Sequence, residues 1–428
     1  MINIIIGLVL LMVLAYLGWS IIWIAPLIAL IVAALEGIEL LPAYTETYMT
    51  GFVEFTLKWF PIFLLGAIFG KLMEETGMAQ SVAFKITQFI GKKRAVLGVL
   101  AGAAVLTYGG VSLFVVVFAI YPLAIALFRS ADVSRNLIPA TIVLGAFTFT
   151  MTALPGTPQI QNIIPTDYFG TTPTAGPIMG IVSGLIMAVG GYFYLAWRGK
   201  KLHSKGEKFT DPKGGDEVKD INPSTLPNAY LSIIPLIVVV VVLNVFKLDI
   251  LLALVIGIIS IMLLSINKFK TFIKSINGGA AGSVMAIVNT SAAVGFGAVV
   301  TAVPSFEQLT DLILGVKGNP LISEAIAVQL LANITGSASG GMGIALEALG
   351  GQYMELAKST GISPEAFHRV AAVASGASIL PHNGALLTLL AVTGLKHKQT
   401  YLDVAVVGLI IPIIAVIAAI VLASLGIY

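Results

Sequence analysis

Long apolar runs, each about the length of a membrane-spanning helix, follow one another along this chain of 428 residues. A helix rises about 1.5 Å per residue, so a hydrocarbon layer of about 30 Å takes roughly 20 apolar residues to cross. Only 11% of the residues are charged, whereas soluble domains carry about 25%, so the chain has too few charges to cover a surface in water. The sequence therefore predicts an all-α polytopic membrane protein. It excludes a soluble enzyme and a nucleic-acid-binding protein.

Ten membrane crossings are predicted, five in each half of the chain. A lysine-rich hydrophilic segment, 198–226, separates the halves and is expected to be a cytoplasmic connector between a first repeat (1–197) and a second repeat (227–428). Two crossings are interrupted by Pro and Gly, at 136–165 and 365–395. The uninterrupted crossings are 2–18, 21–41, 55–74, 173–197, 227–246, 249–266, 278–300 and 401–427.

The segment Ala95–Phe128 carries no charge but does not fit a simple crossing. It is too long for one upright helix and too short for two full crossings with a turn. A Gly-rich sequence lies near its middle. This pattern predicts a re-entrant hairpin over 95–128, with protein or water as hydrogen-bond partners for the backbone groups of its tip. A single tilted, kinked crossing is the alternative. The second half is expected to hold the equivalent hairpin at 320–357.

The order of features repeats, and five crossings per copy invert the second copy relative to the first. When the connector is placed in the cytoplasm by the positive-inside rule, most basic residues lie inside and both termini lie outside. Inverted repeats with broken helices are typical of secondary transporters with a site near the midplane. A multi-pass protein of the cytoplasmic (inner) membrane is therefore expected. Of the 24 basic residues, those placed outside are Lys58, Lys247, Lys317, Lys358 and Arg369.

Four interruptions, the two hairpin tips and the two broken crossings, are predicted to meet at one site. A helix that restarts inside the membrane presents unpaired N–H groups and the positive end of its dipole, which favours an anionic ligand. The alternative is that these Gly, Ser and Thr clusters only permit close helix packing. The predicted substrate-binding residues are Thr107, Tyr108, Gly109, Gly110, Ser112, Gly156, Thr157, Gln159, Thr335, Gly336, Ser337, Ser339, Gly340, His382, Asn383 and Gly384.

No arginine or lysine lies in these four stretches, so carboxylate binding is expected to rest on neutral donors and helix ends. His382 and Glu347 are the predicted proton-coupling residues, because ionisable groups inside the membrane are functional candidates. His382 could instead be a neutral histidine bonded to backbone, and Glu347 a solvated charge. Glu324 and Asp311 are expected near the outer surface.

The sequence gives no sign of a cofactor or a metal site. It contains no cysteine, no Walker loop and no histidine cluster with metal-ligand spacing. Two segments of mixed polarity, 79–91 and 304–316, are predicted to be interfacial helices. They would be either arms between a fixed and a mobile part or plain surface helices.

The segments 335–348 (TGSASGGMGIALEA) and 380–398 (LPHNGALLTLLAVTGLKHK) resemble the gluconate:proton symporter family of the ion-transporter superfamily. Within it they look closest to 3-hydroxybutyrate permease-like members, and Pro155–Pro158 is similar to the family's first break. The resemblance implies an elevator mechanism, a scaffold that forms a homodimer, two hairpins around the substrate and proton coupling. The tips 107–110 and 335–340 and the breaks 155–159 and 381–384 would be the binding elements.

The expected function is a symporter, not an enzyme, that imports a small hydroxy monocarboxylate such as 3-hydroxybutyrate or a sugar acid with protons. Sodium is a possible coupling ion, since carbonyls and hydroxyls at the breaks are also good sodium ligands. A sodium-coupled di- or tricarboxylate carrier, a passive anion channel and an ion-translocating subunit of a larger complex are the alternatives.

Overall fold

The computed structural model describes residues 2–17, 19–91, 94–212, 223–306, 308, 319–381 and 383–428. These residues form helices joined by turns and loops, with no β-strand among them. Four helical segments of the described part are long and apolar enough to cross a membrane: Leu40–Glu75, Pro177–Ser204, Ile266–Ala302 and His397–Ser424. The prediction of an all-α membrane protein is confirmed.

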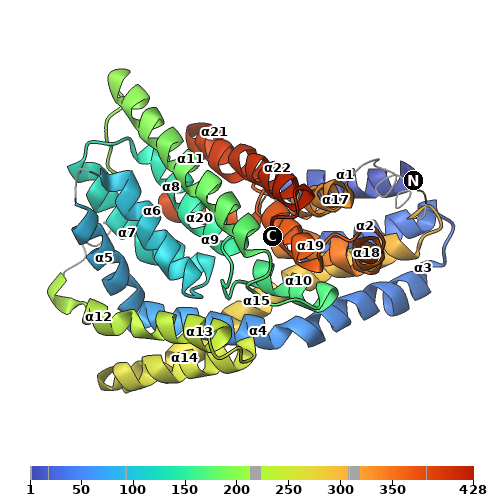
Figure 1. Cartoon of the computed structure of the whole chain (residues 1–428), viewed down its shortest axis with the longest axis horizontal. Helices are drawn as coiled ribbons and strands as arrows, with labels where there is room; N and C mark the ends of the chain where they lie inside the picture. Colours follow the sequence, from blue (N-terminus) through green and yellow to red (C-terminus); the bar gives the residue numbers. More distant parts are fainter. Residues whose placement is uncertain are drawn as a thin grey trace.

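One set of helices, which we call the frame, is built around two long neighbours. α4 (Met49–Glu75) continues α3 (Leu40–Pro42) and the π-helical turn η1 (Ala43–Tyr48), and it packs along α15 (Phe269–Ala302). A Cβ added at Gly279 of α15 would lie 2.6 Å from the Cα of Ile68, so only glycine allows this approach. The other frame helices are α1 (Ile2–Tyr16), α2 (Ile21–Leu35), α13 (Ile234–Asn244) and α14 (Ile250–Leu264). In Figure 1, α4, α13 and α14 run along the lower edge.

A second set, which we call the hairpin group, contains two helical hairpins and two broken helices. The hairpins are α6 (Ala95–Tyr108) with α7 (Leu113–Ser130) and α17 (Pro320–Thr335) with α18 (Ala338–Thr360). A Cβ at Gly341 would lie 2.1 Å from the Ala332 nitrogen, so the arms of the second hairpin touch through backbone. The broken helices are η3 (Arg135–Leu137), α8 (Ile138–Ala146), α9 (Phe149–Thr152) and α10 (Ile160–Phe169), then α19 (Pro364–Ser375) and α20 (Gly384–Thr393).

The remaining helices connect or cover these two sets. α5 (Met78–Ile90) packs on α6 and α12 (Ala229–Ser232), so the expected helix at 79–91 is present; most of 304–316 lies outside the described residues. α11 (Pro177–Ser204) packs against the last crossing, which is α21 (His397–Ala405), the π-helical turn η6 (Val406–Ile410) and α22 (Ile411–Ser424). Short 3-10 turns are η4 (Pro223–Thr225) and η5 (Ile266–Lys268).

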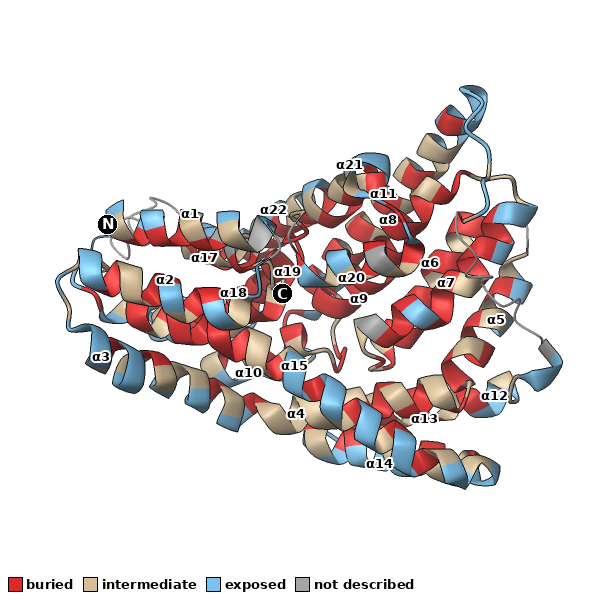
Figure 2. Ribbon diagram, turned by 180° about the vertical axis from the view of Figure 1, so that it is seen from behind, coloured by how far each residue is buried: buried red, intermediate tan, exposed pale blue. Residues whose placement is uncertain are grey.

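The outer surface of the molecule is largely apolar. Figure 2 shows exposed residues along the outward faces of the peripheral helices and buried ones toward the middle. Large apolar side chains are exposed on α4, α11 and α15, among them Leu57, Phe193 and Ile273. Such faces are stable next to lipid rather than water.

Candidate functional site

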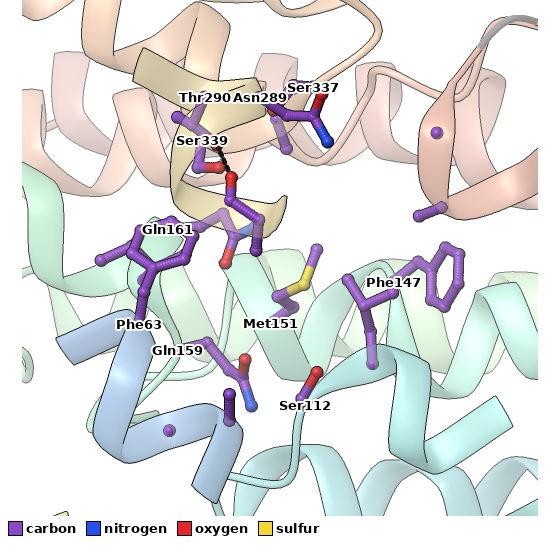
Figure 3. Close-up of a pocket in the computed structure, with 18 of the residues that line it drawn as sticks. Phe63, Ser112, Phe147, Met151, Gln159, Gln161, Asn289, Thr290, Ser337 and Ser339 are labelled. Carbon is purple, nitrogen blue, oxygen red and sulfur yellow. Dashed lines mark hydrogen bonds between the residues drawn. The ribbon is translucent and has the colours of Figure 1, made fainter. Parts of the chain in front are cut away.

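A cavity of about 690 Å³ lies between the frame and the hairpin group. Figure 3 shows Ser112 and Gln159 on one side of it and Ser337 and Ser339 on the other. Both hairpin tips and both breaks contribute to its wall, so the predicted convergence of the four interruptions is observed. Of the residues predicted for the site, those that line the cavity are Gly110, Ser112, Gln159, Thr335, Gly336, Ser337, Ser339, Asn383 and Gly384.

The N-termini of four helices meet at this cavity. Ser112 precedes α7, Gln159 precedes α10, Ser337 precedes α18 and Asn383 precedes α20, and all four residues line the wall. The helix dipole places partial positive charge at each of these ends, where the first N–H groups of the helix lack carbonyl partners within it. The arrangement therefore favours an anion.

The first tip and the first break are held together by side chains. The amide nitrogen of Gln159 donates to the carbonyl oxygens of Thr107 (2.7 Å) and Val111 (3.2 Å). The hydroxyl of Tyr108 donates to the carbonyl oxygen of Pro155 (2.9 Å). Neither Ser112 nor Gln159 caps the helix that follows it, so the first N–H groups of α7 and α10 have no side-chain partner from their own N-cap.

At the second tip and the second break, N-cap side chains accept hydrogen bonds from backbone N–H groups. The Ser337 Oγ accepts from the Gly340 N–H (3.1 Å), and the Asn383 Oδ1 accepts from the Leu386 N–H (3.1 Å). The Gly384 N–H donates to the Gly336 carbonyl at 3.4 Å, which joins the second tip to the second break. Here the N-cap side chains already occupy part of the helix ends.

Several predicted residues lie outside the cavity wall. Thr107 and Thr157 are buried behind it, and each has a hydroxyl oxygen with no hydrogen-bond partner among the described residues. Glu347 is exposed and accepts from the Tyr168 hydroxyl (2.6 Å). His382 lies outside the described residues. The others that do not line the cavity are Tyr108, Gly109, Gly156 and Gly340.

Part of the cavity wall comes from the frame, and the sequence analysis does not predict it. Phe63 and Lys71 of α4 and Asn289 and Thr290 of α15 line the cavity. The only signal for the last two is a short polar run inside an apolar crossing. Lys71 is neutralised by neighbours, because its Nζ lies 3.1 Å from a Glu74 oxygen and 3.2 Å from a Glu75 oxygen.

A buried arginine stands behind the first break. Arg369 of α19, which is expected among the basic residues outside the membrane, is buried in the protein and 0% exposed. Its guanidinium donates to the carbonyl oxygens of Ala153 (3.1 Å) and Ala175 (2.9 Å) and to the Asn162 Oδ1 (2.9 Å). Asn162 in turn donates to the Thr157 carbonyl (2.9 Å). The positively charged guanidinium of Arg369 therefore stabilises the first break from behind, while the groups that the break presents to the cavity are neutral donors.

Glu324 also departs from its expected position. It is 0% exposed instead of lying at the outer surface. The cause is packing between helices, since α17 packs against α18, α19, α1 and α22.

Comparisons with known proteins agree with this architecture. The family model described as GntP family permease matches residues 1–248. The chain is 42% identical to the uncharacterized transporter YxjC of Bacillus subtilis (strain 168), over 96% of each chain. An uncharacterized transporter of Haemophilus influenzae is 29% identical over 46% of this chain and 45% of its own.

A solved structure shares the fold at low identity. The YdaH transporter of Alcanivorax borkumensis superposes with a TM-score of 0.56 at 15% identity, covering 91% of this chain and 89% of its own. The predicted resemblance to the gluconate permease family is confirmed by the family match and by the similarity to YxjC. The chain belongs to the GntP permease family and is a membrane transporter.

Proposed function

We propose that this protein is a secondary active symporter that imports a small hydroxy monocarboxylate, such as 3-hydroxybutyrate or a sugar acid, together with protons. The observation that carries the proposal is the meeting of four helix N-termini at one cavity. Two of these ends, at α7 and α10, have no N-cap side chain bonded to them, so their N–H groups are suited to a carboxylate.

The rest of the wall suits a substrate with hydroxyl groups and a short carbon chain. Ser339, Thr290, Asn289 and Gln161 offer hydroxyl and amide groups, and Met151 is among the apolar contacts. A site that hydrogen-bonds a substrate hydroxyl rejects analogues without it strongly, because its own polar groups are then left unpaired. Neutral donors give the modest affinity that allows a transporter to release its substrate.

An elevator motion is the mechanism we propose, with the frame as scaffold and the hairpin group as moving part. Gln159 ties the first tip to the first break, and the Gly384–Gly336 bond ties the second tip to the second break. Each tip is therefore expected to move with its break as one body. The proposal includes the inverted repeat, a homodimer formed through the frame, an inner-membrane location and both termini outside. The substrate residues remain those predicted above, with His382 and Glu347 as the proton-coupling candidates from sequence.

Uptake of labelled 3-hydroxybutyrate and gluconate into proteoliposomes tests this function. A pH gradient and a sodium gradient would be imposed separately, with lactate, succinate and citrate as competitors. Protein-free vesicles are needed because weak acids cross bilayers as neutral molecules and then accumulate on the alkaline side. At one proton per anion, one pH unit corresponds to about tenfold accumulation.

Accumulation driven by the pH gradient and blocked by hydroxy monocarboxylates supports the symporter. Accumulation driven only by sodium and blocked by succinate or citrate identifies a sodium-coupled di- or tricarboxylate carrier. Uptake that saturates poorly and never exceeds equilibrium identifies a passive anion channel.

A further inference from the structure

A carboxylic acid is buried without a partner in the second hairpin. Glu324 lies in the second turn of α17 and is 0% exposed. Both of its carboxyl oxygens are buried without a hydrogen-bond partner in the described part of the chain. Asp403, the other acid that is buried among the described residues, is paired instead: it accepts from Tyr194 (2.7 Å) and Arg198 (2.8 Å).

The helices packed against α17 provide no counter-charge for Glu324. These helices are α1, α18, α19 and α22. α22 contains no titratable residue, and the only one in α1 is Tyr16. On α18, Tyr353 interacts electrostatically with Glu324, and its hydroxyl lies 3.2 Å from the Ser323 Oγ. The other titratable residues of α18, which are exposed, are Glu347, Glu355 and Lys358.

The titratable residues of α19 are engaged elsewhere. His368 contacts the Thr171 hydroxyl (2.7 Å) and the Asn162 Oδ1 (3.3 Å), and Arg369 donates to the carbonyls around the first break. Glu365 is exposed and accepts from the Gly176 N–H (3.0 Å). Among the described residues, Glu324 is therefore a carboxyl group without a hydrogen-bonded or ion-paired cation.

An ionised carboxylate in such a place is very costly, because burial removes its hydration and no partner replaces it. The neutral acid is far cheaper to bury. The packed hairpin therefore holds Glu324 in its protonated form, and access of water to this face of α17 favours ionisation. Packing of the hairpin and binding of one proton are linked.

The cavity lies at the other end of the same helix. Thr335 and Gly336, which line it, are 11 and 12 positions beyond Glu324, or about 16 to 18 Å along a helix that rises about 1.5 Å per residue. A substrate that contacts the second tip stabilises the packed hairpin. By thermodynamic linkage it then also stabilises the protonated acid.

We propose that Glu324 is the proton-binding residue of the transport cycle. The ionised carboxylate takes a proton from water on the outer side as the hairpin packs with substrate, which forms its O–H bond. That bond breaks when water reaches the acid on the other side of the membrane. The proton then passes to water, and Glu324 becomes an ionised carboxylate again. This inference rests on the proposed proton-coupled function. Glu324 is a different residue from His382 and Glu347, which the sequence predicts for proton coupling.

The test compares Glu324→Gln with the wild type in proteoliposomes, using labelled gluconate and a pH-sensitive dye inside the vesicles. Glutamine copies the shape of the neutral acid but binds no proton. We expect counterflow of gluconate to persist, while accumulation under a one-unit pH gradient falls from about tenfold to about equal concentrations. Proton uptake with substrate is also expected to disappear. Glu355→Gln, on an exposed residue of the same hairpin, is the matched control and should behave as wild type.

Full pH-driven accumulation by Glu324→Gln overturns the assignment while leaving the symporter intact. A wild type that carries gluconate without protons overturns the proposed coupling itself, which is a distinguishable result. If Glu324→Gln does not fold, Glu324→Asp is expected to retain coupling. Infrared spectra of the wild type at pH 7 are expected to show the C=O stretch of a protonated carboxylic acid that responds to substrate. A folded wild type without this band contradicts the proposal.

Discussion

At the scale of single residues, Arg369 connects the second half of the chain to the first break. It sits on α19, yet its guanidinium bonds to carbonyls at Ala153 and Ala175. Its neighbour His368 shares the acceptor Asn162 with it. Because these carbonyls belong to segments without regular helix, they depend on a side chain for their partners. Arg369 therefore stabilises the geometry of the break that carries Gln159.

Replacing Arg369 by Met is expected to lower the thermal stability of the detergent-purified protein strongly. The change leaves several buried carbonyls unpaired, and each such loss costs about 1–3 kcal/mol. Arg369→Lys should recover only part of the loss, since an ammonium does not match the spread of acceptors. Arg129→Met, which removes an exposed pair with Asp211, should change stability by at most about 1 kcal/mol. Equal unfolding temperatures for Arg369→Met and Arg129→Met would contradict this role.

At the scale of helices, the positions of the breaks and tips were predictable, whereas the burial of particular side chains was not. Pro155 and Pro158, with Gly156 between them, interrupt a helix by local chemistry alone, and the structure breaks there. The sequence predicts the second tip at Thr335 to Gly340, and α17 ends at Thr335. Local sequence says nothing about which neighbour covers a helix face.

For this reason, the sequence analysis misplaces or misses side chains whose surroundings come from other helices. Glu324 looks like a surface charge in sequence, but it is buried within the packed helices, and Arg369 is buried against carbonyls of the distant first break. Asn289 and Thr290 join the cavity because α15 packs against α18, which begins at the second hairpin tip. Such contacts depend on how the two halves pack, which no spacing in one half specifies.

The second hairpin gives a test at this scale. Gly341→Ala is expected to destabilise the protein and to reduce uptake, because the added Cβ would lie 2.1 Å from the Ala332 nitrogen on the facing arm. Backbone cannot move aside as a side chain can, so a loss of about 1–3 kcal/mol or more is expected. Gly351→Ala on the same helix meets nothing within 4 Å and should be neutral or slightly stabilising. Unfolding temperature and initial uptake rate measure both effects.

At the scale of the whole molecule, the cavity lies where the frame meets the hairpin group. Gly70 on α4 and Ser112 at the first tip approach closely, since a Cβ at Gly70 would lie 3.5 Å from the Ser112 Cβ. That separation suits a disulfide, whose Cβ atoms are about 3.5–4.5 Å apart. The chain contains no cysteine of its own, so an introduced pair is unambiguous.

The double variant Gly70→Cys with Ser112→Cys is expected to cross-link on oxidation and to stop transport, and reduction should restore the rate of the unoxidised double variant. An elevator cannot move when its two bodies are joined. Gly350→Cys with Tyr168→Cys is the matched control, because an equally close pair (3.5 Å) lies within the hairpin group. It should cross-link without stopping transport. Full uptake by the oxidised Gly70–Ser112 pair would exclude relative motion of the two bodies.

The unequal capping of the two tips has a consequence for molecular handedness. α7 begins without a bond from Ser112, whereas Ser337 bonds into the start of α18. The cavity therefore has two chemically different ends, with Met151 and Phe147 along its wall. For the proposed hydroxy-acid substrate, a carboxylate at one end, a hydroxyl at the other and a methyl group against the wall would fix three substituents of one carbon skeleton. Mirror-image hydroxy acids then cannot fit equally well, and one enantiomer of 3-hydroxybutyrate should be carried in preference to the other.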